Sequence, residues 1–149
     1  MSSISRKLPT IARVLLGAIF FVFGLNGFFH FLPQPPVAAR AMAFAGALAA
    51  TGYFFPLLKT VEILAGALLL TGALVPFALT LLAPIIVNIV AFHAFLAPGN
   101  YVVVGLVLAA EIYLALVNRA AFAPLFARRA PGASRSAPTR LEAATSRAA

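Results

Sequence analysis

The sequence predicts an all-α membrane protein, a polytopic four-helix bundle with an interfacial or re-entrant helix in its first outer loop. Of the 149 residues, 63% are hydrophobic and only 9% are charged, and the mean hydropathy is +1.05. Soluble proteins carry about 25% charged residues. Four apolar runs are each long enough to cross a bilayer, and most Lys and Arg residues flank these runs.

The first expected span covers residues 10–32. At a rise of ~1.5 Å per residue, a helix of this length crosses a hydrocarbon core ~30 Å thick. Basic residues precede it as in a secretory signal, but the apolar run exceeds the ~7–15 residues of a signal and further spans follow. We expect an uncleaved anchor. Pro33, Pro35 and Pro36 are predicted to end this helix, because proline lacks the N–H that a helical turn requires.

Three further spans are predicted at residues 57–75, 77–96 and 101–118. Pro76 is expected to begin a tight turn between the first two of these. Pro84 should kink the third span of the chain without breaking it, since neighbouring helices can satisfy the freed carbonyl. Residues 97–100 (Ala-Pro-Gly-Asn) are typical of a turn.

Residues 37–55 decide between four spans and five. They are Ala-rich and helix-forming but less hydrophobic than the other runs. Four spans place both termini in the cytoplasm with nine of the eleven Lys and Arg residues, leaving only Arg40 and Lys59 outside. Because basic residues favour the cytoplasmic side, we predict four spans and an interfacial or re-entrant helix at 37–52.

The chain outside the spans is expected to be short and basic. Residues 1–9 form a cytoplasmic N-terminus, residues 10–127 the membrane domain, and residues 128–149 a disordered cytoplasmic tail rich in Ala, Pro, Ser and Arg. The net charge of +8 then reflects membrane topology rather than binding to nucleic acid. The absence of Cys excludes disulfides, Fe–S ligation and thiol chemistry, so electron transfer would need a bound cofactor or a partner.

Strongly polar residues inside the apolar runs are the candidate site. A charge or imidazole at membrane depth costs ~2.5–3.5 kcal/mol on insertion scales, so such residues usually face a bundle interior. The predicted topology brings six of them to the outer half of the membrane: Asn26, His30, Lys59, Glu62, Asn88 and His93. Glu111 lies deeper. Aromatic residues gather in the same zone and could wall a pocket: Phe28, Tyr53, Phe92 and Tyr101.

Helical spacing groups these side chains. Asn26 and His30 share a face at i, i+4, and Lys59 and Glu62 share one at i, i+3. Asn88 and His93 are five residues apart, or ~140° on an ideal helix, and need not face one target. We predict one site of His30, Glu62 and His93, oriented by Asn26 and Asn88, with Lys59 at its rim.

Structural roles are the alternative for each residue. Asn26 and Asn88 could form hydrogen bonds between helices that stabilise the bundle by ~0.6 kcal/mol per contact. The two histidines and Lys59 could extend to the membrane surface, Lys59 while pairing with Glu62. The carboxyl groups of Glu62 and Glu111 are harder to explain in this way, because in hydrocarbon they must be paired, hydrated or protonated.

Three segments resemble the DoxX family of small four-helix bacterial membrane proteins. They are Asn-Gly-x-x-His with its flanking Phe residues at 23–33, the Tyr-Phe-x-Pro loop at 51–56 followed by Glu62, and Asn-x-x-x-x-His at 83–93. The resemblance covers residues 10–127. It implies a bacterial inner-membrane protein, and some relatives are subunits of thiosulfate:quinone oxidoreductase or belong to other oxidoreductase complexes. Family membership indicates a fold more firmly than a function.

The leading functional expectation is an accessory membrane subunit that binds a lipophilic redox molecule, such as a quinone, in the outer pocket. A scaffold without a ligand is the first alternative, and a small proton-coupled carrier using Glu62 and Glu111 is the second. Haem b held by His30 and His93 has no other support in the sequence, and no metal site is predicted. Expected partners are the lipid bilayer, oxidoreductase subunits and further copies of the chain.

The four-span topology is testable by cysteine labelling. Because both termini are expected in the cytoplasm, cysteines introduced at Ser3 and Ser134 should be inaccessible to an impermeant thiol reagent added outside intact cells. Labelling of only one of them would establish an odd number of spans and would make residues 37–55 a fifth.

Overall fold

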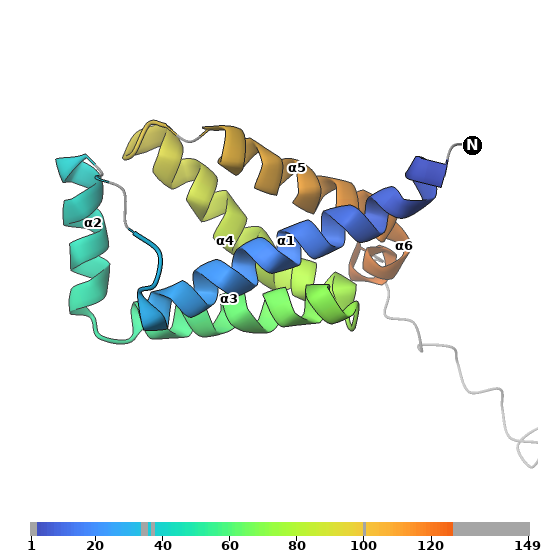
Figure 1. Ribbon diagram of the computed structural model, residues 1–149, viewed down its shortest axis with the longest axis horizontal. Helices are drawn as coiled ribbons and strands as arrows, with labels where there is room; N and C mark the ends of the chain where they lie inside the picture. Colours follow the sequence, from blue (N-terminus) through green and yellow to red (C-terminus); the bar gives the residue numbers. More distant parts are fainter. Residues whose placement is uncertain (1–2, 34–35, 37, 100, 127–149) are drawn as a thin grey trace, which may run out of the picture. The chain divides into compact units, whose positions relative to one another are not determined.

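The computed structural model describes residues 3–33, 36, 38–99 and 101–126, and the elements in this part of the chain are all helical. Five helices follow one another up to residue 117 (Figure 1): α1 (Ser3–Phe29), α2 (Ala39–Ala50), α3 (Phe54–Thr71), α4 (Val75–Phe95) and α5 (Tyr101–Val117). A short helix α6 (Arg119–Phe122) and a 3-10 turn η1 (Ala123–Phe126) come next, at the start of a second unit that begins at Ala120. The tail predicted at 128–149 lies outside the described residues.

Three helices are long and apolar enough to cross a membrane. They are α1 from Lys7 to Phe29, with 23 residues, α3, with 18, and α4, with 21. Helix α5 is also apolar but has only 17 residues. The prediction of an all-helical protein with apolar helices long enough to cross a membrane is therefore confirmed for three helices.

Helices α1 and α3 form the most extensive contact between helices in the described part of the chain, and glycines lie at this contact. A Cβ added to Gly66 would lie 2.6 Å from the backbone N of Phe21 and 2.9 Å from the Gly17 carbonyl oxygen. Further along, a Cβ on Gly24 would meet Ile63 and Glu62. Residue numbers rise along α1 as they fall along α3, so the two helices are antiparallel. Small residues let backbones approach where lipid leaves packing as the main attraction.

The other helices complete the packing around this pair. Helix α5 contacts α1, and α4 contacts both α3 and α5. The largest fully buried side chains are aliphatic and come from all four of these helices: Leu16, Leu69, Leu79, Leu82, Ile86 and Leu114. Helix α4 continues across Pro84 without interruption, as predicted.

The turn between α3 and α4 differs from the prediction, which placed its start at Pro76. Helix α3 already ends at Thr71, and Gly72 caps it with φ +78° and an N–H that donates to Leu68. Pro76 lies in the first turn of α4, where the missing N–H has no helical acceptor in any case. The Arg13 side chain of α1 donates to the carbonyls of Leu69 and Leu70 beside this turn. A cation thus satisfies carbonyls that the helix end leaves free.

The end of α1 also differs from the prediction. The helix stops at Phe29, before the prolines, because His30 adopts φ +51°. The Asn26 Oδ1 accepts a hydrogen bond of 2.6 Å from the N–H of Leu32, which lies beyond the helix. This bond fixes the direction in which the chain leaves α1. Proline is therefore not what ends the helix here.

Helix α2 confirms that the ambiguous segment is helical, over Ala39–Ala50. It contacts α3 and lies crosswise to that helix in Figure 1. With 12 residues it reaches only about 18 Å, short of a hydrocarbon core of about 30 Å.

The glycine contact predicts a difference between two Gly→Ala substitutions. Gly66→Ala should destabilise the protein by about 1–3 kcal/mol, because its Cβ would meet backbone atoms that cannot move alone. Gly105→Ala in α5 is the matched control, since no described atom lies within 4 Å of its added Cβ. It should be neutral or stabilising by up to about 1 kcal/mol through helix propensity. Thermal unfolding in detergent measures both, and equal effects would contradict the α1–α3 contact.

Candidate functional site

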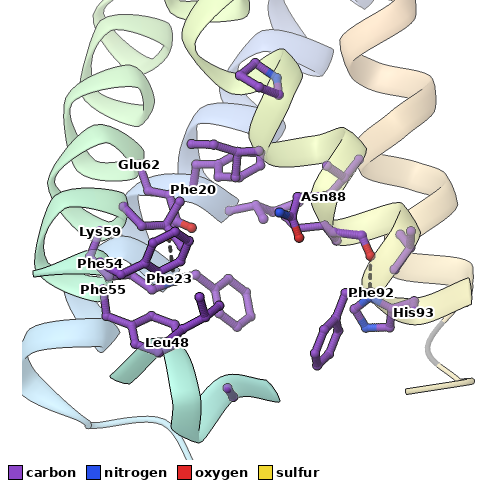
Figure 2. Close-up of a pocket in the computed structure, with 18 of the residues that line it drawn as sticks. Phe20, Phe23, Leu48, Phe54, Phe55, Lys59, Glu62, Asn88, Phe92 and His93 are labelled. Carbon is purple, nitrogen blue, oxygen red and sulfur yellow. Dashed lines mark hydrogen bonds and ion pairs between the residues drawn. The ribbon is translucent and has the colours of Figure 1, made fainter. Parts of the chain in front are cut away.

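A cavity of about 630 Å³ lies among helices α1 to α5 (Figure 2). Its volume is typical of small-molecule sites, which span about 300–1,000 Å³. Its aromatic walls consist of six phenylalanines: Phe20, Phe23, Phe44, Phe54, Phe55 and Phe92. Four polar side chains also line it, namely Lys59, Glu62, Asn88 and His93. The cavity is therefore apolar with a few polar groups, as is usual for ligand pockets.

The polar residues on α3 form an ion pair. The Lys59 Nζ lies 2.7 Å from Oε2 of Glu62, three residues later and on the same helix face. Glu62 is only 4% exposed, so the ammonium group compensates a carboxylate that would otherwise be buried alone. The Lys59 stem lies against Gly27 of α1, where any side chain would collide with it. A glycine on α1 thus makes room for a lysine on α3.

His93 on α4 is held by its own helix. Its Nδ1 lies 2.9 Å from the carbonyl oxygen of Ile89, so Nδ1 carries the proton and donates it. In the neutral ring, Nε2 is then a free acceptor. The ring packs edge to face on Phe92 at a centroid distance of 5.6 Å, and Phe92 in turn lies 6.1 Å from Phe44 of α2.

Asn88 on α4 contributes an unengaged amide. It lines the cavity, yet no hydrogen bond joins its side chain to any of the residues that the structure describes. In Figure 2, Lys59 and Glu62 lie on one side of the cavity and Asn88 and His93 on the other. The α3 side is already paired internally, whereas the α4 side has a free amide.

The structure corrects the predicted grouping of His30 with Glu62 and His93. His30 does not line the cavity and is exposed, because the left-handed turn after α1 directs the chain away from the helix. Asn26 does not line it either. It is buried, and its side chain oxygen is used at the end of α1. Glu111 is buried elsewhere on α5.

Only one of the four predicted pocket aromatics lines the cavity. Phe92 does, whereas Phe28, Tyr53 and Tyr101 are exposed and lie outside the lining. Sequence reasoning missed Phe20, Phe23 and Phe44 as pocket residues. The i, i+3 spacing of Phe20 and Phe23 places them on one face of α1, a signal that could have found them.

Comparison of the chain with protein-family models, curated proteins and solved structures finds no match in any of the three. The cavity must therefore be interpreted from its own residues.

The ion pair predicts non-additive stability effects. Lys59→Met and Glu62→Gln should each destabilise the protein by about 1–3 kcal/mol, since each removes a charge-assisted hydrogen bond and leaves its partner in a poorly hydrated site. The double variant should lose less than the sum, because contacting residues are coupled.

His30 supplies the control for this cycle. His30→Asn keeps a residue that tolerates the left-handed backbone, and its effect should add to that of Glu62→Gln. Melting of the three single and two double variants measures both couplings. A coupling of His30 to Glu62 as large as that of Lys59 would contradict the geometry described above.

Proposed function

We propose that the chain is a four-helix membrane bundle in which α1, α3, α4 and α5 cross the bilayer and α2 lies at its outer interface. Helix α5 is short but its 17 residues still reach about 25 Å, which a thin or locally compressed bilayer accommodates. Its contacts with α1 and α4 support a place in the same bundle. The distribution of Lys and Arg supports cytoplasmic termini.

We propose that the cavity binds a flat, lipophilic molecule with a quinone-like head. The observation that carries the proposal is the Asn88 amide, which lines a cavity walled by phenylalanines without a hydrogen-bond partner among the described residues. Asn88 is exposed, so its amide is accessible to a bound molecule. A bound molecule with carbonyl or hydroxyl oxygens would supply the missing partner.

The donors and acceptors around the cavity suit such a head group. The Asn88 Nδ2 can donate to a ligand carbonyl, while the free Nε2 of His93 can accept from a ligand hydroxyl. Lys59 uses one of its three N–H donors for Glu62 and keeps others. The phenylalanine rings favour a planar ring through stacking and edge contacts.

The role we propose is that of an accessory subunit rather than a complete enzyme. The chain has no Cys, so electrons for a redox ligand would come from a partner subunit or cofactor. The resemblance of the Asn-Gly-x-x-His, Tyr-Phe-x-Pro and Asn-x-x-x-x-His segments to the DoxX family supports a place in the bacterial inner membrane beside oxidoreductase subunits.

Mass spectrometry of the gently solubilised protein tests the proposal. The wild-type chain should carry a lipophilic aromatic or quinonoid molecule, and Asn88→Leu should lose it because the substitution replaces the amide in the cavity lining with methyl groups on a side chain of the same branched shape. Asn118→Leu is the matched control. Its amide bonds to the Leu114 carbonyl on α5, outside the cavity lining, so this variant should retain the ligand.

The result also decides between ligand binding and the scaffold alternative. If the wild-type protein and both variants carry the same lipids and no aromatic molecule, the polar groups only hold the helices together. Equal ligand loss in Asn88→Leu and Asn118→Leu would likewise contradict a site at Asn88.

A further inference from the structure

Glu111, on α5, is a buried carboxyl group that the proposed ligand site does not use. It is only 7% exposed, and its Oε2 has no hydrogen-bond partner in the part of the chain that the structure describes. The acidic group on α3 differs in this respect, since Glu62 pairs with Lys59.

Among the described residues, no cation forms an ion pair with Glu111. Helix α5 packs against α1 and α4, whose titratable groups with described side chains are Lys7, Arg13 and His93, and α5 itself carries Tyr101 and Tyr113. Arg13 is engaged by the carbonyls at the end of α3, and His93 by the Ile89 carbonyl. Within the described residues, the one ion pair is that of Lys59 with Glu62.

The position of Glu111 relates it to the cavity. Val104 and Val107 line the cavity from α5, and Glu111 follows them by seven and four residues on the same helix face. The carboxyl group therefore lies one helical turn beyond the cavity wall. Val107 is only 5% exposed and is the cavity-lining residue that precedes Glu111 by one turn.

We propose that Glu111 is a protonated carboxyl group that exchanges its proton with the cavity. An ionised carboxylate without a partner is strongly disfavoured in an apolar interior. The neutral acid carries no charge, and its single O–H needs only one hydrogen-bond acceptor. Movement of the Val107 side chain would let the Glu111 O–H meet a water or a ligand oxygen in the cavity. The proton then passes to that oxygen, leaves a carboxylate on Glu111, and returns by the same route.

This inference does not rest on the identity of the proposed ligand, because the proton can exchange with water alone. Its failure would leave the Asn88 experiment untouched. Conversely, a protein without a bound ligand could still have a protonated Glu111.

Dicyclohexylcarbodiimide is the probe, since this apolar reagent modifies protonated carboxyl groups within membranes. The full-length protein is treated in lipid vesicles and its peptides are analysed by mass spectrometry. We expect an adduct on Glu111 and none on Glu62, whose carboxyl group is occupied by its contact with Lys59. Glu111→Gln should lose the adduct. The chain has only three acidic side chains, so each can be assigned separately.

Two valine variants test the route to the cavity. Val107→Ala shortens the cavity-lining side chain that precedes Glu111 by one turn and should speed labelling. Val102→Ala, at a position that is 86% exposed, is the matched control and should leave the rate unchanged. Equal rates in these two variants would overturn exchange with the cavity.

Infrared spectroscopy tests protonation without a reagent or a folding-sensitive variant. The wild-type protein should show the carbonyl stretch of a protonated carboxylic acid, and this band should shift in heavy water. Absence of the band, or an adduct on Glu62 instead of Glu111, would overturn the proposal.

Discussion

The contact of α1 with α3 through Gly17, Gly24 and Gly66 is the constraint on which the rest of the structure depends. In a bilayer the lipid is as apolar as the helix surface, so helices gain little from hydrophobic burial and associate by close packing. Glycines permit that packing on one line of each helix. The same line continues to Gly27, where α1 leaves room for the Lys59 stem. The position of the ion pair is thus a consequence of the glycine contact, and one wall of the cavity is set by it.

Two polar side chains near the ends of these helices have defined structural partners. Arg13 reaches the last carbonyls of α3, and the Asn26 side chain holds the N–H of Leu32 after α1 ends. Such bonds matter because a helix end leaves several backbone groups free, and hydrocarbon offers them no water. Polar residues near the ends therefore have a structural explanation. Asn88 and Glu111 do not, since each retains a polar atom without a hydrogen-bond partner among the described residues.

The helical class and most helix positions could be predicted from composition and apolar runs, because these depend only on length and hydropathy. The pairing of Lys59 with Glu62 was also predictable, since i, i+3 spacing is a local property. The position of the His30 side chain outside the cavity could not be predicted. Its i, i+4 relation to Asn26 assumes that the helix continues, whereas the backbone turns left-handed at His30 itself. The cavity phenylalanines of α1 and α2 were missed for a different reason. Which face of an apolar helix points inward depends on its neighbours, and periodicity is weak when all faces are apolar.

The two sides of the cavity differ in how much binding energy they can offer a ligand. On α3, the ammonium and carboxylate groups already satisfy each other, so a ligand gains there only by competing with or adding to an existing bond. On α4, the Asn88 amide and the His93 Nε2 gain a partner that the described part of the chain does not provide. Asn88 is exposed and His93 is half-buried, so both groups are accessible to a ligand, and a new bond there displaces no bond within the described part of the chain. Selectivity for a ligand should therefore come mainly from α4, while α3 sets the electrostatic environment and the phenylalanines set the shape.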